Sequence, residues 1–350
     1  MSAKHHVGWA LGPYAFLPLC LLSLTGACAD VQLPAIIGDS MVLQRGLPIR
    51  IWGDADPGEQ VSVGLAGHHG VATASSGGTW RTSLPAMEAG GPFDLTITGS
   101  NCIVVHDVMI GEVWVCAGQS NMRLPVELCS DSTVEIANAT RPDIRLFTVD
   151  DPTASVPPEE VVDRWLPCSP ETVGPFSGAA YFFGRYLHEA LGVPIGLIES
   201  AVDSSPVERW TSLSALQGDP DIGPAMGQWP SAIRPGELFE AMVRPLVPYR
   251  IRGVVWYQGE ANVRRAYQYR KLFPTLIRDW RTRWGQGDFP FLYVQLSTYL
   301  ARESVPSESY WAELREAQLM ALAVPNTAQA VAVDIGDGAN LHPPNKQDVG

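Results

Sequence analysis

The sequence lacks the patterns that mark several large classes of protein. It has no run of basic residues, and with 24 Lys and Arg against 37 Asp and Glu its formal net charge is -13. A chain of this charge is a poor partner for nucleic acid or for an anionic membrane surface. Neither a phosphate loop nor a dinucleotide fingerprint is present, and there is no internal repeat. We therefore expect no nucleic-acid partner and no cofactor.

Long apolar runs are confined to the N-terminus. Lys4, an apolar run over 15–24 and the small residues at 27–29 form the pattern of a secretory signal. No later run is long enough to span a bilayer. Residues 1–29 are therefore predicted to be a signal peptide, and the mature protein to be secreted or periplasmic. Lipidation of Cys28 is the less favoured alternative.

Cysteine is scarce, and no two cysteines have the spacing of a zinc site, so we expect no metal. Four cysteines follow the predicted signal, an even number for a compartment in which disulfides form. Cys116 lies inside an apolar run and is expected to be buried and inert. The pairing expected by elimination is Cys129 with Cys168.

The residues that are abundant predict a two-part fold. Apolar residues make up 46% of the chain, which is enough to fill a large core. Short alternating runs separated by turns predict a small antiparallel β-sandwich domain over 30–108. Alternating strands and helices over 109–350 predict an α/β domain with a parallel sheet flanked by helices. The expected strands of this second domain are 111–117, 194–200, 251–257, 289–296 and 328–335, and its expected helices are 177–191, 238–246, 267–284 and 310–323.

A candidate nucleophile follows the first of these strands. The run 111–117 is apolar without alternation, as in a strand buried on both faces of a sheet. Gly118 permits a sharp turn, which presents Ser120 at the carboxyl end of the strand, where open α/β sheets hold their chemistry. The alternative interpretation is that Ser120 caps the next helix.

A serine nucleophile needs a base, and the α/β part has only His188 and His342. His188 lies within a predicted helix, which favours a structural role. His342 lies in a loop rich in Gly, Asp and Pro and is the candidate base. The group that orients the imidazole must be a carboxylate. Glu260, Asp334 and Asp337 all lie at or just past a strand end.

An ester hydrolase also needs donors for the oxyanion that forms in the transition state. The candidates are the backbone N–H of Ser120, the side-chain amide of Gln258 or Asn262, and a backbone N–H near Ser204. Gln119, next to the nucleophile, is included among the candidate substrate-binding residues.

Three stretches, 111–122, 256–262 and 334–343, together resemble the sialate O-acetylesterase family of SGNH-type hydrolases. The likeness covers nearly the whole chain after residue 29. It implies an SGNH-like fold and a secreted serine esterase that removes acetyl groups from sialic acid or other sugars through an acyl-enzyme. It also implies Ser120 as nucleophile, His342 as base and Glu260 as acid, with Asp337 as the alternative acid.

The sequence departs from the family pattern at several places. Residues 202–206 read Val-Asp-Ser-Ser-Pro where Trp-Gly-Gly-Thr-Pro is usual, so that Ser204 replaces a glycine. Residues 122–125 read Met-Arg-Leu-Pro where Met-Glu-Trp-Pro is usual, and Ala339 stands where an Asp is expected. The family also continues beyond Gly350, so we expect a truncated carboxyl end. These departures favour one alternative, a catalytically impaired carbohydrate-binding homologue.

Overall fold

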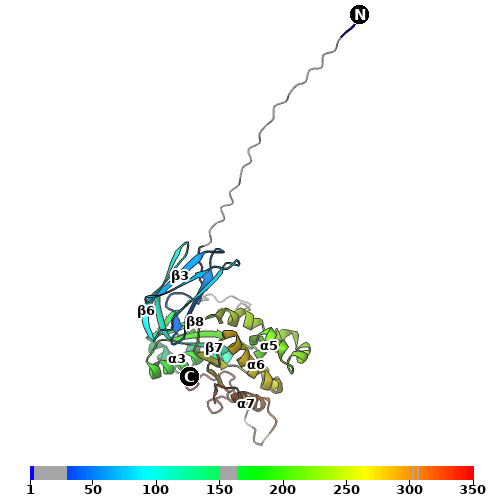
Figure 1. The fold of residues 1–350 in the computed structure, drawn as a ribbon. Coiled ribbons are helices and arrows are strands. Elements are labelled where there is room, and N and C mark those ends of the chain that lie inside the picture. The colour runs from blue at the N-terminus through cyan, green and yellow to red at the C-terminus, as the bar shows by residue number, and fades with distance from the viewer. Residues whose placement is uncertain (4–29, 150–163, 302, 306) are drawn as a thin grey trace.

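A large central sheet flanked by helices gives the computed structural model a mixed α/β fold (Figure 1). The structure describes residues 1–3, 30–149, 164–301, 303–305 and 307–350, so most of the predicted signal peptide lies outside the described residues. Adjacent strands of the main path are parallel except for the last pair. In spatial order the strands are β13 (Thr327–Ala330), β12 (Phe291–Val294), β11 (Gly253–Tyr257), β7 (Cys102–Gly118), β10 (Ile195–Ala201), β8 (Arg141–Thr148) and β9 (Leu166–Cys168).

Strand β7 connects the N-terminal strands to the central sheet. Its first half pairs antiparallel with β6 (Gly90–Thr98), and its second half pairs parallel with β10 and β11. Every residue from Val108 to Gly118 is buried, as expected for a strand covered on both faces. The strand passes through residue 108 without a break. The boundary expected after that residue therefore falls within one continuous strand.

The strands before β7 are short. β3 (Gln60–Leu65) pairs antiparallel with β4 (His68–Thr73) and β6, and β2 (Ile49–Asp54) pairs antiparallel with β5 (Thr79–Leu84). β1 (Val42–Gln44) pairs parallel with β7. Alternate residues of β3 and β5 are buried, which is the pattern of strands with one face on a core. Their buried side chains belong to the same apolar cluster as one face of the central sheet.

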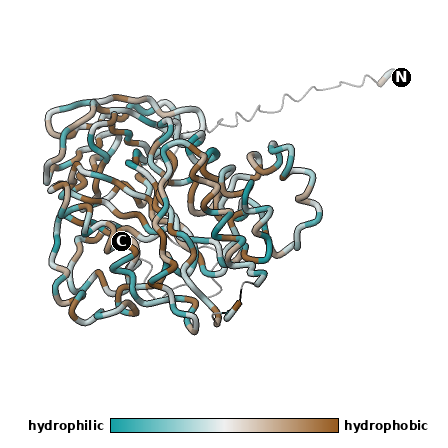
Figure 2. The backbone as a smooth tube through the Cα atoms, turned by 90° about the horizontal axis from the view of Figure 1, so that it is seen from below, coloured by the Kyte–Doolittle hydropathy of each residue, from teal (hydrophilic) through white to brown (hydrophobic). Residues whose placement is uncertain are grey.

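Helices cover both faces of the central sheet, at the positions expected from the sequence. α3 (Gly178–Leu191) begins at Ser177, whose hydroxyl accepts from Ala180 N, and ends at Gly192. α6 (Ala266–Trp284) and α7 (Tyr310–Met320) follow later. Trp114 of β7 contacts Phe183 of α3, whereas Trp256 of β11 contacts α6 through Phe273 and Trp280. Figure 2 shows hydrophobic residues along the inner segments and hydrophilic ones on many outer loops.

Two expected elements differ from the structure. Residues 238–246 do not form an α-helix but a π-helical turn, η4 (Phe239–Val243), and a 3-10 turn, η5 (Arg244–Leu246). Pro245 has no N–H to continue the helical ladder, which explains the change. The strand expected over 328–335 ends at Ala330, and the chain leaves the sheet edge for the loop that contains His342. In the described part of the chain, no helix is long and apolar enough to cross a bilayer.

The cysteines do not form the expected disulfide. Cys129 and Cys168 are free thiols, so the predicted pairing is wrong. Each thiol donates to a backbone carbonyl of another residue, Cys129 to Pro125 O at 3.3 Å and Cys168 to Ala139 O at 3.4 Å. Burial raises the pKa of Cys129 to about 11 and that of Cys168 to about 12, which keeps both groups protonated. Cys116 is buried in β7, as expected.

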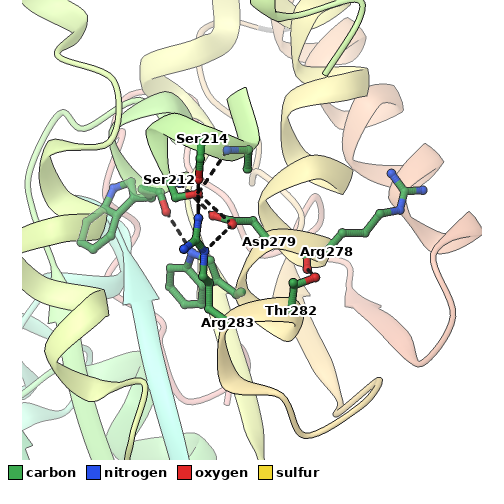
Figure 3. Close-up of polar contacts among 9 residues, drawn as sticks. Ser212, Ser214, Arg278, Asp279, Thr282 and Arg283 are labelled. Atoms are coloured by element: carbon green, nitrogen blue, oxygen red, sulfur yellow. Dashed lines mark hydrogen bonds and ion pairs between the residues drawn. The ribbon is translucent and has the colours of Figure 1, made fainter. Parts of the chain in front are cut away.

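The buried carboxylate of Asp279 joins the segment after Trp210 to helix α6 (Figure 3). Asp279 of α6 accepts from Ser212 N and from Ser212 Oγ, both at 2.8 Å, and from Arg283 Nε at 3.2 Å. Ser212 caps the short helix α5 (Leu213–Gly218), since its hydroxyl also accepts from Ala215 N. Asp279 therefore fixes the start of α5 against α6.

Gly118 is the last residue of β7 and lies two positions before the candidate nucleophile, Ser120. We expect Gly118→Ala to destabilise the fold by at least about 3 kcal/mol. Its φ is 149° and an added Cβ would lie 2.1 Å from Tyr257 O. Gly192→Ala is the matched control, because Gly192 also has a positive φ, 63°, but has nothing within 4 Å of the added Cβ. It should cost only about 1 kcal/mol. Urea unfolding measures both, and equal losses would contradict the steric explanation.

Candidate active site

Ser120 lies at the carboxyl edge of the central sheet and contacts the candidate base. It is the first residue of the short helix α1 (Ser120–Arg123), and Gln119 N donates to Tyr257 O at 3.1 Å just before it. The Ser120 hydroxyl does not cap this helix. Its Oγ instead lies 2.8 Å from Nε2 of His342, a residue 222 positions later in the chain. The structure therefore brings the predicted nucleophile and the predicted base together.

His342 is partly buried in the loop that follows β13. Its backbone N–H donates to Asn340 Oδ1 at 2.9 Å, which fixes the backbone just before the ring. Burial lowers the pKa of the imidazole, the nearby Lys346 charge lowers it further, and Asp203 opposes both. The ring is therefore neutral at pH 7 and can accept a proton from the serine. The other histidine considered, His188, donates from Nδ1 to Val193 O at 2.8 Å, which agrees with the expected structural role.

Glu260 does not contact the imidazole. Its Oε1 accepts from Asn121 Nδ2 at 2.5 Å, and its buried Oε2 has no hydrogen-bond partner among the described residues. Burial raises the pKa of this carboxyl group. The two alternative carboxylates have no recorded contact with the imidazole either. Asp334 and Asp337 are both exposed, and Asp337 Oδ1 accepts from Ala339 N at 2.9 Å. The direct carboxylate–imidazole contact expected from the sequence is thus replaced by a contact with Asn121.

Two amide side chains predicted to serve the substrate, those of Gln258 and Asn262, bind protein groups instead. Gln258 Nε2 donates to Gln119 Oε1 at 3.2 Å, to Ser205 O at 3.1 Å and to Asn262 Oδ1 at 2.9 Å. Asn262 Nδ2 donates to Glu208 Oε2 at 2.9 Å. Gln258 and Asn262 are fully buried, and Gln119 is 2% exposed. The donors of Gln258 and Asn262 are directed at protein acceptors, so the prediction that Gln258 or Asn262 binds the oxyanion is corrected. Gln119 Oε1 accepts from Gln258, whereas the substrate-binding role of the Gln119 amide donor stays a prediction.

The donors that remain for an oxyanion are backbone N–H groups. Ser120 opens α1, and the first N–H groups of a helix have no partner inside it. Ser204 lies in an exposed turn with φ of 56°, the left-handed region that favours glycine. Next to it, Asp203 forms an ion pair with Arg123 at 3.7 Å. Two of the departures from the family pattern, at 123 and 203, therefore meet at the rim of the site.

Sequence reasoning missed two residues of this site, Asn121 and Lys346. Asn121 Nδ2 also donates to Leu341 O at 3.0 Å, and Lys346 Nζ donates to Asn121 Oδ1 at 2.7 Å and to Pro343 O at 2.9 Å. Both side chains are buried. The available signal was weak: Lys346 is the only Lys or Arg after Arg315.

Across the described ranges, no group of three or more His, Cys, Asp or Glu side chains is placed to hold an ion. The groups in contact at the carboxyl edge of the parallel sheet are a hydroxyl and an imidazole. This arrangement defines the class of serine hydrolases.

Comparison with known proteins narrows this class. Residues 110–349 match the family model described as carbohydrate esterase, sialic acid-specific acetylesterase. The sialate O-acetylesterases of Pongo abelii and Homo sapiens are each 33% identical over 95% of this chain and 71% of their own. A carbohydrate acetylesterase from Xanthomonas citri is 35% identical and superimposes with a TM-score of 0.82, over 91% of this chain and 72% of its own. The chain belongs to this carbohydrate esterase family and is a carboxylic ester hydrolase.

Because no carboxylate contacts the imidazole, we expect neither Glu260→Gln nor Asp337→Asn to cause the roughly 10⁴-fold loss of kcat seen when an orienting carboxylate is removed. Asp337→Asn should stay near the wild-type rate. Glu260→Gln should lose about tenfold, because it disturbs Asn121 rather than the base itself. Steady-state hydrolysis of an aryl acetate measures both variants. A loss of 10³-fold or more in either one would restore that residue as the acid of a triad.

Proposed function

We propose that this enzyme removes O-acetyl groups from acetylated carbohydrates, sialic acids included, through an acyl-enzyme on Ser120. The observation that carries the proposal is the 2.8 Å contact between Ser120 Oγ and His342 Nε2. The substrate class comes from the names of the relatives, sialate O-acetylesterase and carbohydrate acetylesterase. The same contact favours an active enzyme over a catalytically impaired sugar-binding homologue, because it is kept despite the departures at 123 and 203.

The reaction that we propose begins with proton transfer from Ser120 Oγ to His342 Nε2 as the oxygen attacks the acetyl carbonyl. The tetrahedral oxyanion faces the backbone N–H of Ser120 and that of the 203–204 turn. The imidazolium then gives its proton to the departing sugar oxygen, which leaves acetyl-Ser120. His342 next takes a proton from water as the water oxygen attacks the acetyl group, and it returns that proton to Ser120 Oγ as acetate leaves, which restores the free serine and the neutral imidazole.

We further propose secretion of the enzyme after removal of a signal peptide at 1–29. The support is the sequence pattern alone: Lys4, the apolar run and the small residues before Asp30. We also propose that residues 30–108 form a small β-sandwich domain in front of an SGNH-like esterase domain over 109–350. The paired antiparallel strands β2–β5 and β4–β3–β6 support this description. Nucleic acid is not expected as a partner of so acidic a chain.

We expect Ser120→Ala and His342→Ala to lower kcat by about 10³-fold or more, because a serine without its base is a poor nucleophile. Acetate release from acetylated sialic acids, acetylated xylan and an aryl acetate measures the effect and ranks the substrates. His188→Ala is the matched histidine control and should keep the wild-type kcat. Chelator should leave the rate unchanged. Full activity in Ser120→Ala would refute the proposed mechanism, and no release from any substrate would favour the impaired homologue.

We expect Ser204→Gly to change the tolerance for longer acyl chains more than the rate of acetate hydrolysis. The backbone N–H is common to both residues, whereas removal of the side chain widens the space beside the oxyanion. Glycine also adopts the left-handed φ of 56° without steric cost. The measurement is the ratio of kcat/KM for butyrate and acetate aryl esters, which should rise. An unchanged ratio would show that the Ser204 side chain does not limit the acyl group.

A further inference from the structure

Lys346 is a buried cation whose contacts the proposed reaction does not use. Its side chain is fully buried, and within the described part of the chain it forms no ion pair with a carboxylate. Its hydrogen-bond acceptors are Asn121 Oδ1 at 2.7 Å and Pro343 O at 2.9 Å. Removing an ammonium group from water without a directly bonded carboxylate is unfavourable. Burial of the Lys346 ammonium group therefore lowers the stability of the fold, which indicates that this lysine has a role in the site.

Lys346 and Asn121 form hydrogen bonds to the backbone on both sides of the base, His342. Asn121 Nδ2 donates to the carbonyl oxygen of Leu341, the residue before His342, at 3.0 Å. Lys346 Nζ donates to the carbonyl oxygen of Pro343, the residue after His342. The two side chains are bonded to each other, and Asn121 directly follows Ser120. These contacts, which we name the Asn121–Lys346 clamp, tie the backbone of the nucleophile to the backbone of the base.

We propose that Lys346 is a positioning residue of this esterase, which holds His342 against Ser120 through the Asn121–Lys346 clamp. The inference rests on the proposed function and deepens it. Neither Lys346 nor Asn121 takes part in bond making. Their effect is on the distance between Ser120 Oγ and His342 Nε2, and on the proton affinity of the imidazole.

The charges around the clamp agree with this role. The groups that face His342 are Lys346, which lowers the imidazole pKa, and Asp203, which raises it. Burial lowers the pKa of Lys346 to about 8, so most of it is charged at pH 7. Glu260 and Cys129 face Lys346 and oppose that shift, and its Nζ also lies 5.2 Å from the centre of the Tyr257 ring.

The test is the pH profile of Lys346→Met in the full chain with an aryl acetate as substrate. We expect kcat to fall about 10- to 100-fold with KM within about twofold of wild type, because the substrate still binds but the base is misplaced. Removal of the positive charge raises the imidazole pKa, so the acid limb of kcat/KM should move to higher pH. Lys346→Gln, which can still donate hydrogen bonds but has no charge, should recover part of kcat and show the same displacement of the limb.

Two controls separate this effect from general damage. Asp203→Asn removes the opposite charge facing His342, so its acid limb should move to lower pH. Lys271→Met is the matched control on the surface of α6, where Lys271 pairs with Asp221 at 2.9 Å, and it should change neither kcat nor the profile. Thermal unfolding of every variant reports whether the fold is intact. If Lys346→Met does not fold, Lys346→Gln decides the question.

A wild-type kcat in both Lys346 variants, or a loss of kcat with an unmoved acid limb, would overturn the inference. A wild-type enzyme without Ser120-dependent hydrolysis would instead overturn the proposed function. The clamp is then tested without turnover, by NMR titration of the His342 ring in protein labelled with ¹⁵N-histidine. A higher pKa for His342 in Lys346→Met than in wild type supports the charge effect, and equal values overturn it.

Discussion

The hydrogen bond between Ser120 and His342 is the contact on which the rest of the site depends, and it joins residues 222 positions apart. One such bond contributes only about 1 kcal/mol net to stability, too little to hold a long loop in place. The loop around His342 is held instead by bonds to its backbone, from Asn121 at Leu341 and from Lys346 at Pro343. The hydrogen bonds to the residues that flank His342 therefore determine the geometry of the Ser120–His342 pair.

A second polar network holds the sheet edge beneath the reacting pair. Gln258 is fully buried and donates to Gln119, to Asn262 and to a backbone carbonyl, while Tyr269 donates to its Oε1. Buried amides with all these partners rigidify the loops that they join. Of the positions that depart from the family pattern, Ser205 contributes its backbone carbonyl to this network, whereas Arg123, Asp203 and Ser204 are exposed. The Ser120–His342 contact of 2.8 Å is formed with these departures present.

The sequence predicts those parts of the site that depend on local pattern. The apolar run before Gly118 predicts the buried strand and the presented serine, and the scarcity of histidine leads to His342. Partners brought together only by the tertiary fold escape such reasoning. Gln258 and Lys346 illustrate this. The Gln258 amide binds other loops, and the Lys346 ammonium group reaches the site, only because the fold places distant segments around them. The expected Cys129–Cys168 disulfide fails for the same reason, because the fold brings each thiol to the backbone carbonyl of a different residue, Pro125 for Cys129 and Ala139 for Cys168.

The central claim, that Ser120 carries the acyl group, is tested most directly by trapping the intermediate. Wild-type enzyme is mixed with an aryl acetate in excess, quenched in acid during turnover, digested, and analysed by mass spectrometry. With an activated ester, deacylation limits the rate and the acyl-enzyme accumulates. The account predicts one added acetyl group on the peptide that contains Ser120, at that residue. An acetyl group on another side chain, or turnover with no acetylated peptide, would contradict it.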